Sequence, residues 1–294
     1  MIAEATLHSL FIYGLIPLVF LLAVLSSLRT YGRNATIRTF LTMAVAGLLM
    51  EGLTMRLFAS HTYNGIFPVP IGDVPLVIVL GWVVIIFISH EIVQAMQIPR
   101  STVGFLMMGA LAVNIDLMLD PLAEAVGLWH WNIANSFYGV PLGNFLGWFL
   151  IVFLFNHLSA SRAVKRVFPN VIMRSLFLAI MPVLLILPVG VAWLHLDVEN
   201  VIGPVNAKAV VGLLSCGTFI AGVWYAHARQ QCADVDVTLP CILFLLIHLA
   251  FLAGAAAAAE HDLMAWSVLY IAAATPYLTP LVQRGQAGPV SSAT

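Results

Sequence analysis

Two aspartates stand four residues apart near the end of an apolar stretch, at Asp116 and Asp120 in NIDLMLDPLAEAVGLWHWNIANSFYGVPLGNFLGWF. Residues four apart lie on the same face of a helix, so this spacing predicts a pair of neighbouring carboxyl groups. Two carboxyl groups in an apolar environment cannot both ionise cheaply, and one should keep its proton near neutral pH. A carboxyl group that keeps its proton can serve as a general acid.

Glu51 and Asn144 are expected to lie near these aspartates. Glu51 is about two helical turns from the end of the apolar run 37–58, and Asn144 opens the run 143–160. Arg56, five residues after Glu51, suggests a purely structural alternative. In that case the arginine would neutralise Glu51 or one of the aspartates in a buried ion pair that holds helices together.

Three aromatic residues, Trp129, Trp131 and Tyr138, follow in a segment too polar for a lipid-facing span. Pro121 is expected to end the helix directly after Asp120, because proline restricts the residue before it. The segment then predicts a loop or half-helix over the outer mouth of a bundle. Tryptophan and tyrosine are common at membrane interfaces, but aromatic faces also attract cations. Beside a proton-donating acid, such faces suit chemistry that passes through a carbocation.

The composition places these groups in a membrane. Hydrophobic residues make up 62% of the 294 positions, charged residues 9%, and the mean hydropathy is +1.02, whereas a soluble domain carries roughly 25% charged residues. Apolar runs of about 20 residues can cross the hydrocarbon core as helices. The sequence predicts an all-α, polytopic integral membrane bundle of about nine transmembrane helices, or seven or eight if the last boundaries differ. The runs are 8–28, 37–58, 74–96, 101–120, 143–160, 171–194, 208–228, 239–258 and 263–283. Residues 1–284 are expected to form one transmembrane domain, and 285–294 a flexible tail.

Basic residues fall in every second predicted loop, at Arg29, Arg33, Arg38, Arg100, Arg162, Lys165, Arg166, Arg174, Arg229 and Arg284. The intervening loops are mainly acidic and contain Asp73, Asp120, Glu124, Asp197, Glu199, Glu260 and Asp262. The positive-inside rule therefore predicts a cell-membrane protein with its N-terminus outside and its C-terminus in the cytoplasm. Glu51, Asp116, Asp120 and Asn144 then share the outer leaflet. A carboxyl group inside a membrane helix is costly, so each is a functional candidate.

Other polar residues carry weaker signals. His90 and Glu91 are expected to pair with Asn156 and His157 near the inner ends of their runs. The nine histidines show no clustered spacing of the kind that membrane di-iron enzymes need, so we expect no metal site. The glycines form no phosphate-binding motif, and the sparse cations predict no nucleic-acid surface.

The block from Asp116 to Trp148 resembles the signature of the membrane carotenoid-biosynthesis family that includes the acyclic carotenoid 1,2-hydratases and the bisanhydrobacterioruberin hydratases. The matching elements are D-x-x-x-D-P, W-x-W and Y-G-V-P-x-x-N-F-x-G-W. Upstream, MEGLTMRLF, a tyrosine and VPLVIVLGW resemble the second block of that family. The outer loop ASHTYNGIFPVPIGD departs from its usual P-F-G-x-Y-x-Y stretch, which bears on substrate identity more than on reaction type.

The resemblance implies a hydratase that adds water to the terminal double bond of an acyclic carotenoid or similar long isoprenoid, without a cofactor. Asp116, Asp120 or Glu51 would supply the acid. Residues implied to bind substrate or stabilise the cation are Trp129, Trp131, Tyr138, Asn144, Tyr63, Trp82 and Trp148. Residues in possible support are Arg56, Asp73 and Asn114. The expected partners are the isoprenoid and the lipid bilayer, and the oligomeric state stays open.

Three other activities fit parts of the pattern. A proton-initiated terpenoid or carotenoid cyclase would use the same acid but would exclude water. A magnesium-dependent intramembrane prenyltransferase would use Asn114, Asp116 and Asp120, but only one aspartate-rich motif is present, and no basic cluster lies beside it to bind diphosphate. A proton-coupled transporter would use the intramembrane acids as a relay, but the sequence lacks the internal repeats typical of that class.

Overall fold

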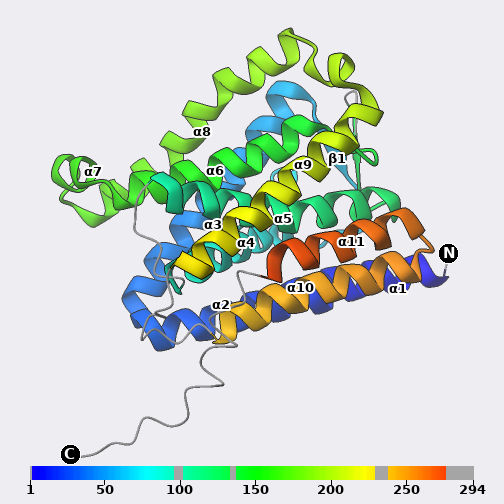
Figure 1. Cartoon of the computed structure of the whole chain (residues 1–294). Coiled ribbons are helices and arrows are strands. Elements are labelled where there is room, and N and C mark those ends of the chain that lie inside the picture. Colours follow the sequence, from blue (N-terminus) through cyan, green and yellow to red (C-terminus); the bar gives the residue numbers. More distant parts are fainter. Residues whose placement is uncertain (1, 96–101, 133–136, 229–237, 276–294) are drawn as a thin grey trace, which may run out of the picture.

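The computed structural model describes residues 2–95, 102–132, 137–228 and 238–275 and forms a bundle of long helices (Figure 1). The helices are α1 Ile2–Ser9, η1 Leu10–Leu15 (a π-helix), α2 Ile16–Tyr31, α3 Arg33–Phe58, α4 Leu76–Ala95, α5 Thr102–Ala125, α6 Leu142–Ala160, α7 Arg162–Val167, α8 Val171–His195, α9 Val198–Ala228, α10 Thr238–Ala257 and α11 His261–Ala274. The strands are β1 His61–Tyr63, β2 Pro70–Ile71, β3 Val74–Pro75 and β4 Trp129–Trp131.

Seven helices among the described residues are long and apolar enough to cross a membrane: Thr6–Tyr31, Arg33–Phe58, Leu76–Gln94, Thr102–Ala125, Leu142–Ala160, Val171–His195 and Leu239–Ala257. They match the first six predicted runs and the eighth. Helix α9 covers the seventh run and bends at Gly203, where φ is +69°. Helix α11 covers the first part of the ninth predicted run. The predicted tail 285–294 lies outside the described residues. The prediction of an all-α, polytopic membrane bundle is confirmed, with its count of about nine as an approximation.

Helix α5 forms the centre of the bundle and packs against α4, α6, α10 and α11. Pro121 does not end this helix after Asp120, as the sequence had predicted, because α5 continues to Ala125. Proline removes only one backbone donor, and the next residues keep the helical bonds, as Val126 N donates to Leu122 O. The helix ends at Ala125, just before Gly127, whose φ of +71° fits the glycine that commonly follows a helix C-terminus.

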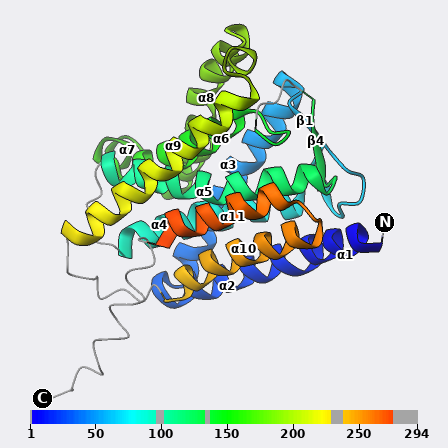
Figure 2. The same ribbon diagram turned by 45° about the vertical axis from the view of Figure 1, so that its right-hand side comes forward.

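Two connections that are far apart in sequence meet at one end of the bundle. Strand β1 pairs antiparallel with β4, which places His61 opposite Trp131 and Tyr63 opposite Trp129 (Figure 2). The segment after α5 thus contributes a strand at this end. The short helix α7, which carries Lys165 and Arg166, lies at the opposite end (Figure 1).

Polar pairs also join the helices away from this sheet. His90 Nδ1 lies 2.8 Å from Asn156 Oδ1, which confirms the predicted link between the third and fifth runs. Glu91 Oε1 accepts a hydrogen bond from the Tyr31 hydroxyl at 2.6 Å. These contacts give the buried polar groups of α4 partners on neighbouring helices.

Candidate active site

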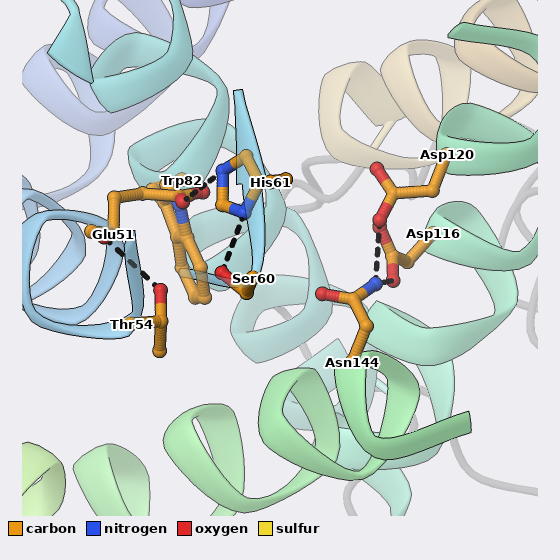
Figure 3. A network of polar contacts seen from close by, with 8 residues as sticks. All are labelled: Glu51, Thr54, Ser60, His61, Trp82, Asp116, Asp120 and Asn144. Atoms are coloured by element: carbon orange, nitrogen blue, oxygen red, sulfur yellow. Dashed lines mark hydrogen bonds and ion pairs between the residues drawn. The ribbon is translucent and has the colours of Figure 1, made fainter. Parts of the chain in front are cut away.

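Asp116 and Asp120 lie on one face of α5 and share a contact with Asn144 in the first turn of α6 (Figure 3). Asn144 Nδ2 donates to Asp116 Oδ2 at 2.9 Å and also to Asp120 Oδ2. Both aspartates are buried. Neither forms an ion pair with a lysine or arginine in the described part of the chain, where Asp116 Oδ1 also lacks a hydrogen-bond partner. The two acids therefore face each other without a neutralising cation.

A second polar cluster surrounds Glu51 of α3 (Figure 3). Trp82 Nε1 donates to Glu51 Oε1 at 2.8 Å, and His61 Nε2 lies 3.2 Å from Glu51 Oε2. On the other side of its ring, His61 Nδ1 lies 2.9 Å from Ser60 Oγ. Glu51 keeps its side chain 12% exposed, whereas His61 and Ser60 are buried. Glu51, His61 and Ser60 thus form a continuous chain of polar contacts.

Glu199 holds the start of α6, and hence the neighbourhood of Asn144. Its carboxylate accepts hydrogen bonds from Leu142 N at 3.0 Å and Gly143 N at 2.8 Å. Trp193 Nε1 donates to the same group at 2.9 Å. The first N–H groups of a helix have no partners within it, so a carboxylate at this position both satisfies them and suits the helix dipole.

Both polar clusters border one cavity with an empty volume of about 1470 Å³, including its open mouth. Glu51, His61, Asp120 and Asn144 line it, whereas Asp116 is buried behind its wall. The rest of the lining is mainly apolar, and most of it comes from α3, α4, α5, α6, α8 and α10. No group of three histidine, cysteine, aspartate or glutamate side chains suited to a metal ion occurs among the described residues. The mainly apolar lining with Glu51 and Asp120 in it offers carboxyl groups to an apolar molecule.

Aromatic side chains form much of the cavity wall near the acids. Trp129 and Trp131 of β4 line it, together with Tyr63. Trp82 and Trp148 also line it and stack with their ring centroids 3.5 Å apart. Burial raises the pKa of the Tyr63 hydroxyl well above its usual value, and the nearby Glu51 and Asp120 carboxylates raise it further. Tyr63 therefore stays neutral and able to donate a hydrogen bond.

Other predicted site residues lie away from the cavity lining. Trp266 Nε1 donates to the Tyr138 hydroxyl at 2.8 Å, and Lys208 Nζ lies 4.3 Å from the centre of the Tyr138 ring. Asn114 Oδ1 contacts His248 Nε2 of α10 at 2.7 Å. These contacts tie α5 and the loop before α6 to the later helices.

The suggested ion pair between Arg56 and one of the buried acids is not observed. Arg56 Nη2 instead pairs with Asp73 Oδ2 at 3.1 Å, and these side chains are 68% and 59% exposed. A long arginine side chain at the helix end can reach solvent, where its charge costs less than in the bundle. The polar contacts of Glu51 are therefore with Trp82 and His61 and not with Arg56.

The sequence model of a family described as "Carotenoid biosynthesis protein" matches residues 10–215. The chain belongs to this carotenoid biosynthesis family. Both polar clusters and most of the cavity wall lie within the matched residues. Helix α10 lies beyond them, yet its Ile247 and Phe251 also line the cavity.

One relative of this carotenoid biosynthesis protein is the bisanhydrobacterioruberin hydratase of Haloarcula japonica. It is 31% identical over 97 residues, which cover 32% of this chain and 33% of the relative. The match thus spans about a third of the relative's length. No solved structure matches the chain significantly.

Sequence reasoning missed three polar residues of this site: Ser60, His61 and Glu199. Ser60 and His61 lie in the loop that departs from the family pattern, so no motif marked them. Glu199 stood out only as one acid in an outer loop. The run W-x-x-x-x-x-E from Trp193 to Glu199 carried the available signal, because a buried tryptophan N–H usually finds a hydrogen-bond acceptor.

Proposed function

We propose that this protein is a hydratase that adds water to the terminal double bond of an acyclic carotenoid or a similar long isoprenoid. The observation that carries the proposal is Asp120 in the wall of a mainly apolar cavity, in contact with Asn144, which also contacts Asp116 behind the wall. Membership of a carotenoid biosynthesis family and the partial match to a named hydratase support it.

The first step is protonation of the alkene. Asp116 and Asp120 lie together in a buried, cation-free setting, which favours a pair that holds one proton between its two carboxyl groups. Asp120 borders the cavity and donates this proton to the less substituted carbon of the terminal double bond. The positive charge then forms on the more substituted carbon.

The second step is capture of the tertiary cation by water. Trp129, Trp131 and Tyr63 border the cavity and present aromatic rings that attract a positive charge. Loss of the shared proton leaves both aspartates ionised, and their negative charge stabilises the cation electrostatically. Water then adds to the cationic carbon and yields a tertiary alcohol, while the polyene lies in the apolar part of the cavity and in the bilayer.

The test is expression in a host that makes lycopene, followed by mass spectrometry of the pigments for the gain of one water. We expect Asp116→Asn, Asp120→Asn and Glu51→Gln each to lower the hydrated product by about 100-fold, the scale of general acid–base catalysis. Asp73→Asn is the control, because Asp73 pairs with Arg56 on the surface. Full turnover in all three variants would end the proposal, and a cyclised pigment of unchanged mass would identify a cyclase instead.

A further inference from the structure

The cavity wall carries two chemically different polar groups that stand apart (Figure 3). One is Asp116, Asp120 and Asn144, and the other is Glu51, His61 and Ser60. Hydration of an alkene also has two proton transfers, one onto carbon and one away from the attacking water. Two separate groups allow each transfer its own acid or base.

The aspartate group is suited to donate. Its two carboxyl groups share a single amide donor, and no lysine or arginine of the described chain pairs with them. A carboxyl pair in this setting holds a proton because two neighbouring negative charges repel each other at low dielectric.

The Glu51 group is suited to accept. Glu51 takes a hydrogen bond from Trp82 Nε1 on one oxygen and faces His61 Nε2 at 3.2 Å with the other. A carboxylate and an imidazole thus lie in contact, and these are the side chains that most often act as general bases. The imidazole of His61 can take up a proton and share it with this carboxylate.

The ring of His61 is also held in place. Tyr63 meets it edge to face at a centroid distance of 5.0 Å, and Trp131 of the paired strand lies 4.9 Å away. Ser60 Oγ, at 2.9 Å from Nδ1, completes the chain of contacts, and both Ser60 and His61 line the cavity. Such orientation by neighbouring groups is what a general base requires.

We propose that Glu51, His61 and Ser60 form the water-activating side of the site, where the Glu51–His61 pair accepts the proton that water loses. This inference rests on the proposed hydratase function. As the new C–O bond forms at the cationic carbon, one O–H bond of water breaks and its proton goes to the Glu51–His61 pair. The proton from the aspartates has by then formed the new C–H bond, so one water is added and nothing is oxidised or reduced.

After the addition, the site must return a proton from the Glu51 side to the aspartates. The Tyr63 hydroxyl is close enough to Glu51 and Asp120 for both carboxylates to act on it electrostatically. Tyr63 also lines the cavity and contacts the His61 ring. It therefore offers a route between the two groups, because a neutral hydroxyl can accept one proton and release another. Every proton is then accounted for within the site.

The experiment separates the two transfers in deuterium oxide with purified protein and lycopene. If the aspartates alone protonate the alkene, His61→Gln and Glu51→Gln should still form the cation. That cation then loses a proton from a neighbouring carbon, and the recovered alkene carries deuterium. We expect these variants to lose hydrated product by about 100-fold while deuterium still enters the alkene. Asp120→Asn should lose both products.

His130→Gln is the matched control. His130 lies on the same small sheet as His61, and its ring is also next to a glutamate, with Nδ1 3.3 Å from Glu124 Oε1. Unlike His61, it does not line the cavity. It should leave both products unchanged. Deuterium entry into the alkene itself reports a folded acid group. If His61→Gln does not accumulate in membranes, Ser60→Ala should show the same selective loss of hydration. Equal loss of hydration and deuterium entry in folded variants would overturn the inference, whereas absence of hydration in the unaltered protein would overturn the proposed function itself.

Discussion

Asn144 is the residue on which the acid pair depends most directly. Among the residues that the structure describes, it is the single side chain whose amide donates to both Asp116 and Asp120. We expect Asn144→Leu to lower hydration by about 10- to 100-fold, because a hydrogen bond to a charged group contributes about 1.5–3 kcal/mol. Product per unit of membrane protein measures the effect. Asn206→Leu is the control, since its amide donates only to Ile202 O on the exposed side of α9. Equal activity of the two variants would contradict this role.

The residues that could be predicted are placed by local helix geometry, whereas those that could not are placed by contacts between distant parts of the chain. Asp116, Asp120 and Asn144 were predictable because four-residue spacing and helix ends determine which side chains share a face. His61 was not, because its place depends on the pairing of β1 with β4 across 70 positions of sequence. Tyr138 was expected at the site from the motif, but it lies away from the cavity lining. Trp266 of α11 contacts its hydroxyl and Lys208 of α9 contacts its ring, and no local sequence pattern connects these helices to Tyr138.

At the scale of elements, Glu199 of α9 positions α6 through the backbone donors of Leu142 and Gly143. We expect Glu199→Gln to lower the unfolding free energy by about 1 kcal/mol, the usual effect of losing a helix cap. Hydration should fall as well, because the first turn of α6 carries Asn144. Glu260→Gln is the matched control: Glu260 precedes α11 without a side-chain cap bond. Thermal unfolding and product assays on both variants measure the difference, and equal melting temperatures would refute the capping role.

Helices α3 and α8 both contribute residues to the cavity wall, and some of those from α8 are exposed. Thr54 and Phe58 line it from α3, and Val189 and Leu194, which are 39% and 40% exposed, line it from α8. Gly190 sits between them, and a Cβ there would come within 3.1 Å of the Phe58 ring. A side chain at this position would press on the Phe58 ring.

We predict that the isoprenoid chain leaves the cavity along these exposed residues of α8, next to Phe58 of α3. Gly190→Leu should lower turnover of a long carotenoid by roughly tenfold, because overpacking costs about 1–3 kcal/mol. A short acyclic isoprenoid that fits inside the cavity should be affected less. Ala192→Leu on the exposed face of α8 is the control. If both substrates lose activity equally in Gly190→Leu, the chain does not use this passage.

At the scale of the whole molecule, composition and run length were enough to predict a helical membrane bundle, because the bilayer admits few other architectures. The end of α5 was not predictable from Pro121 alone. Packing around the centre of the bundle outweighs the loss of one backbone bond, and the helix ends at Ala125, just before Gly127. Likewise, the role of α10 in the cavity wall follows from its contacts with α2, α4 and α5, which sequence spacing does not encode.

One end of the bundle carries basic residues and the other carries the β1–β4 sheet, which makes the orientation in the membrane testable. Lys165 and Arg166 of α7 lie at one end, and the β1–β4 sheet at the other (Figure 1). Arg100, Arg229 and Arg284 lie outside the described residues. Because basic loops remain in the cytoplasm, the sheet and its cavity should face the outside.

A pair of single cysteines tests this orientation in a variant whose three native cysteines are replaced. Thr62→Cys lies on the exposed edge of β1, and Lys165→Cys lies on exposed α7. A membrane-impermeant maleimide added to intact cells should label position 62 at once and position 165 only after permeabilisation. Both variants should retain hydration, since neither side chain lines the cavity. The opposite labelling order would place the acid groups in the cytoplasmic leaflet, and water would then reach the cation from inside the cell.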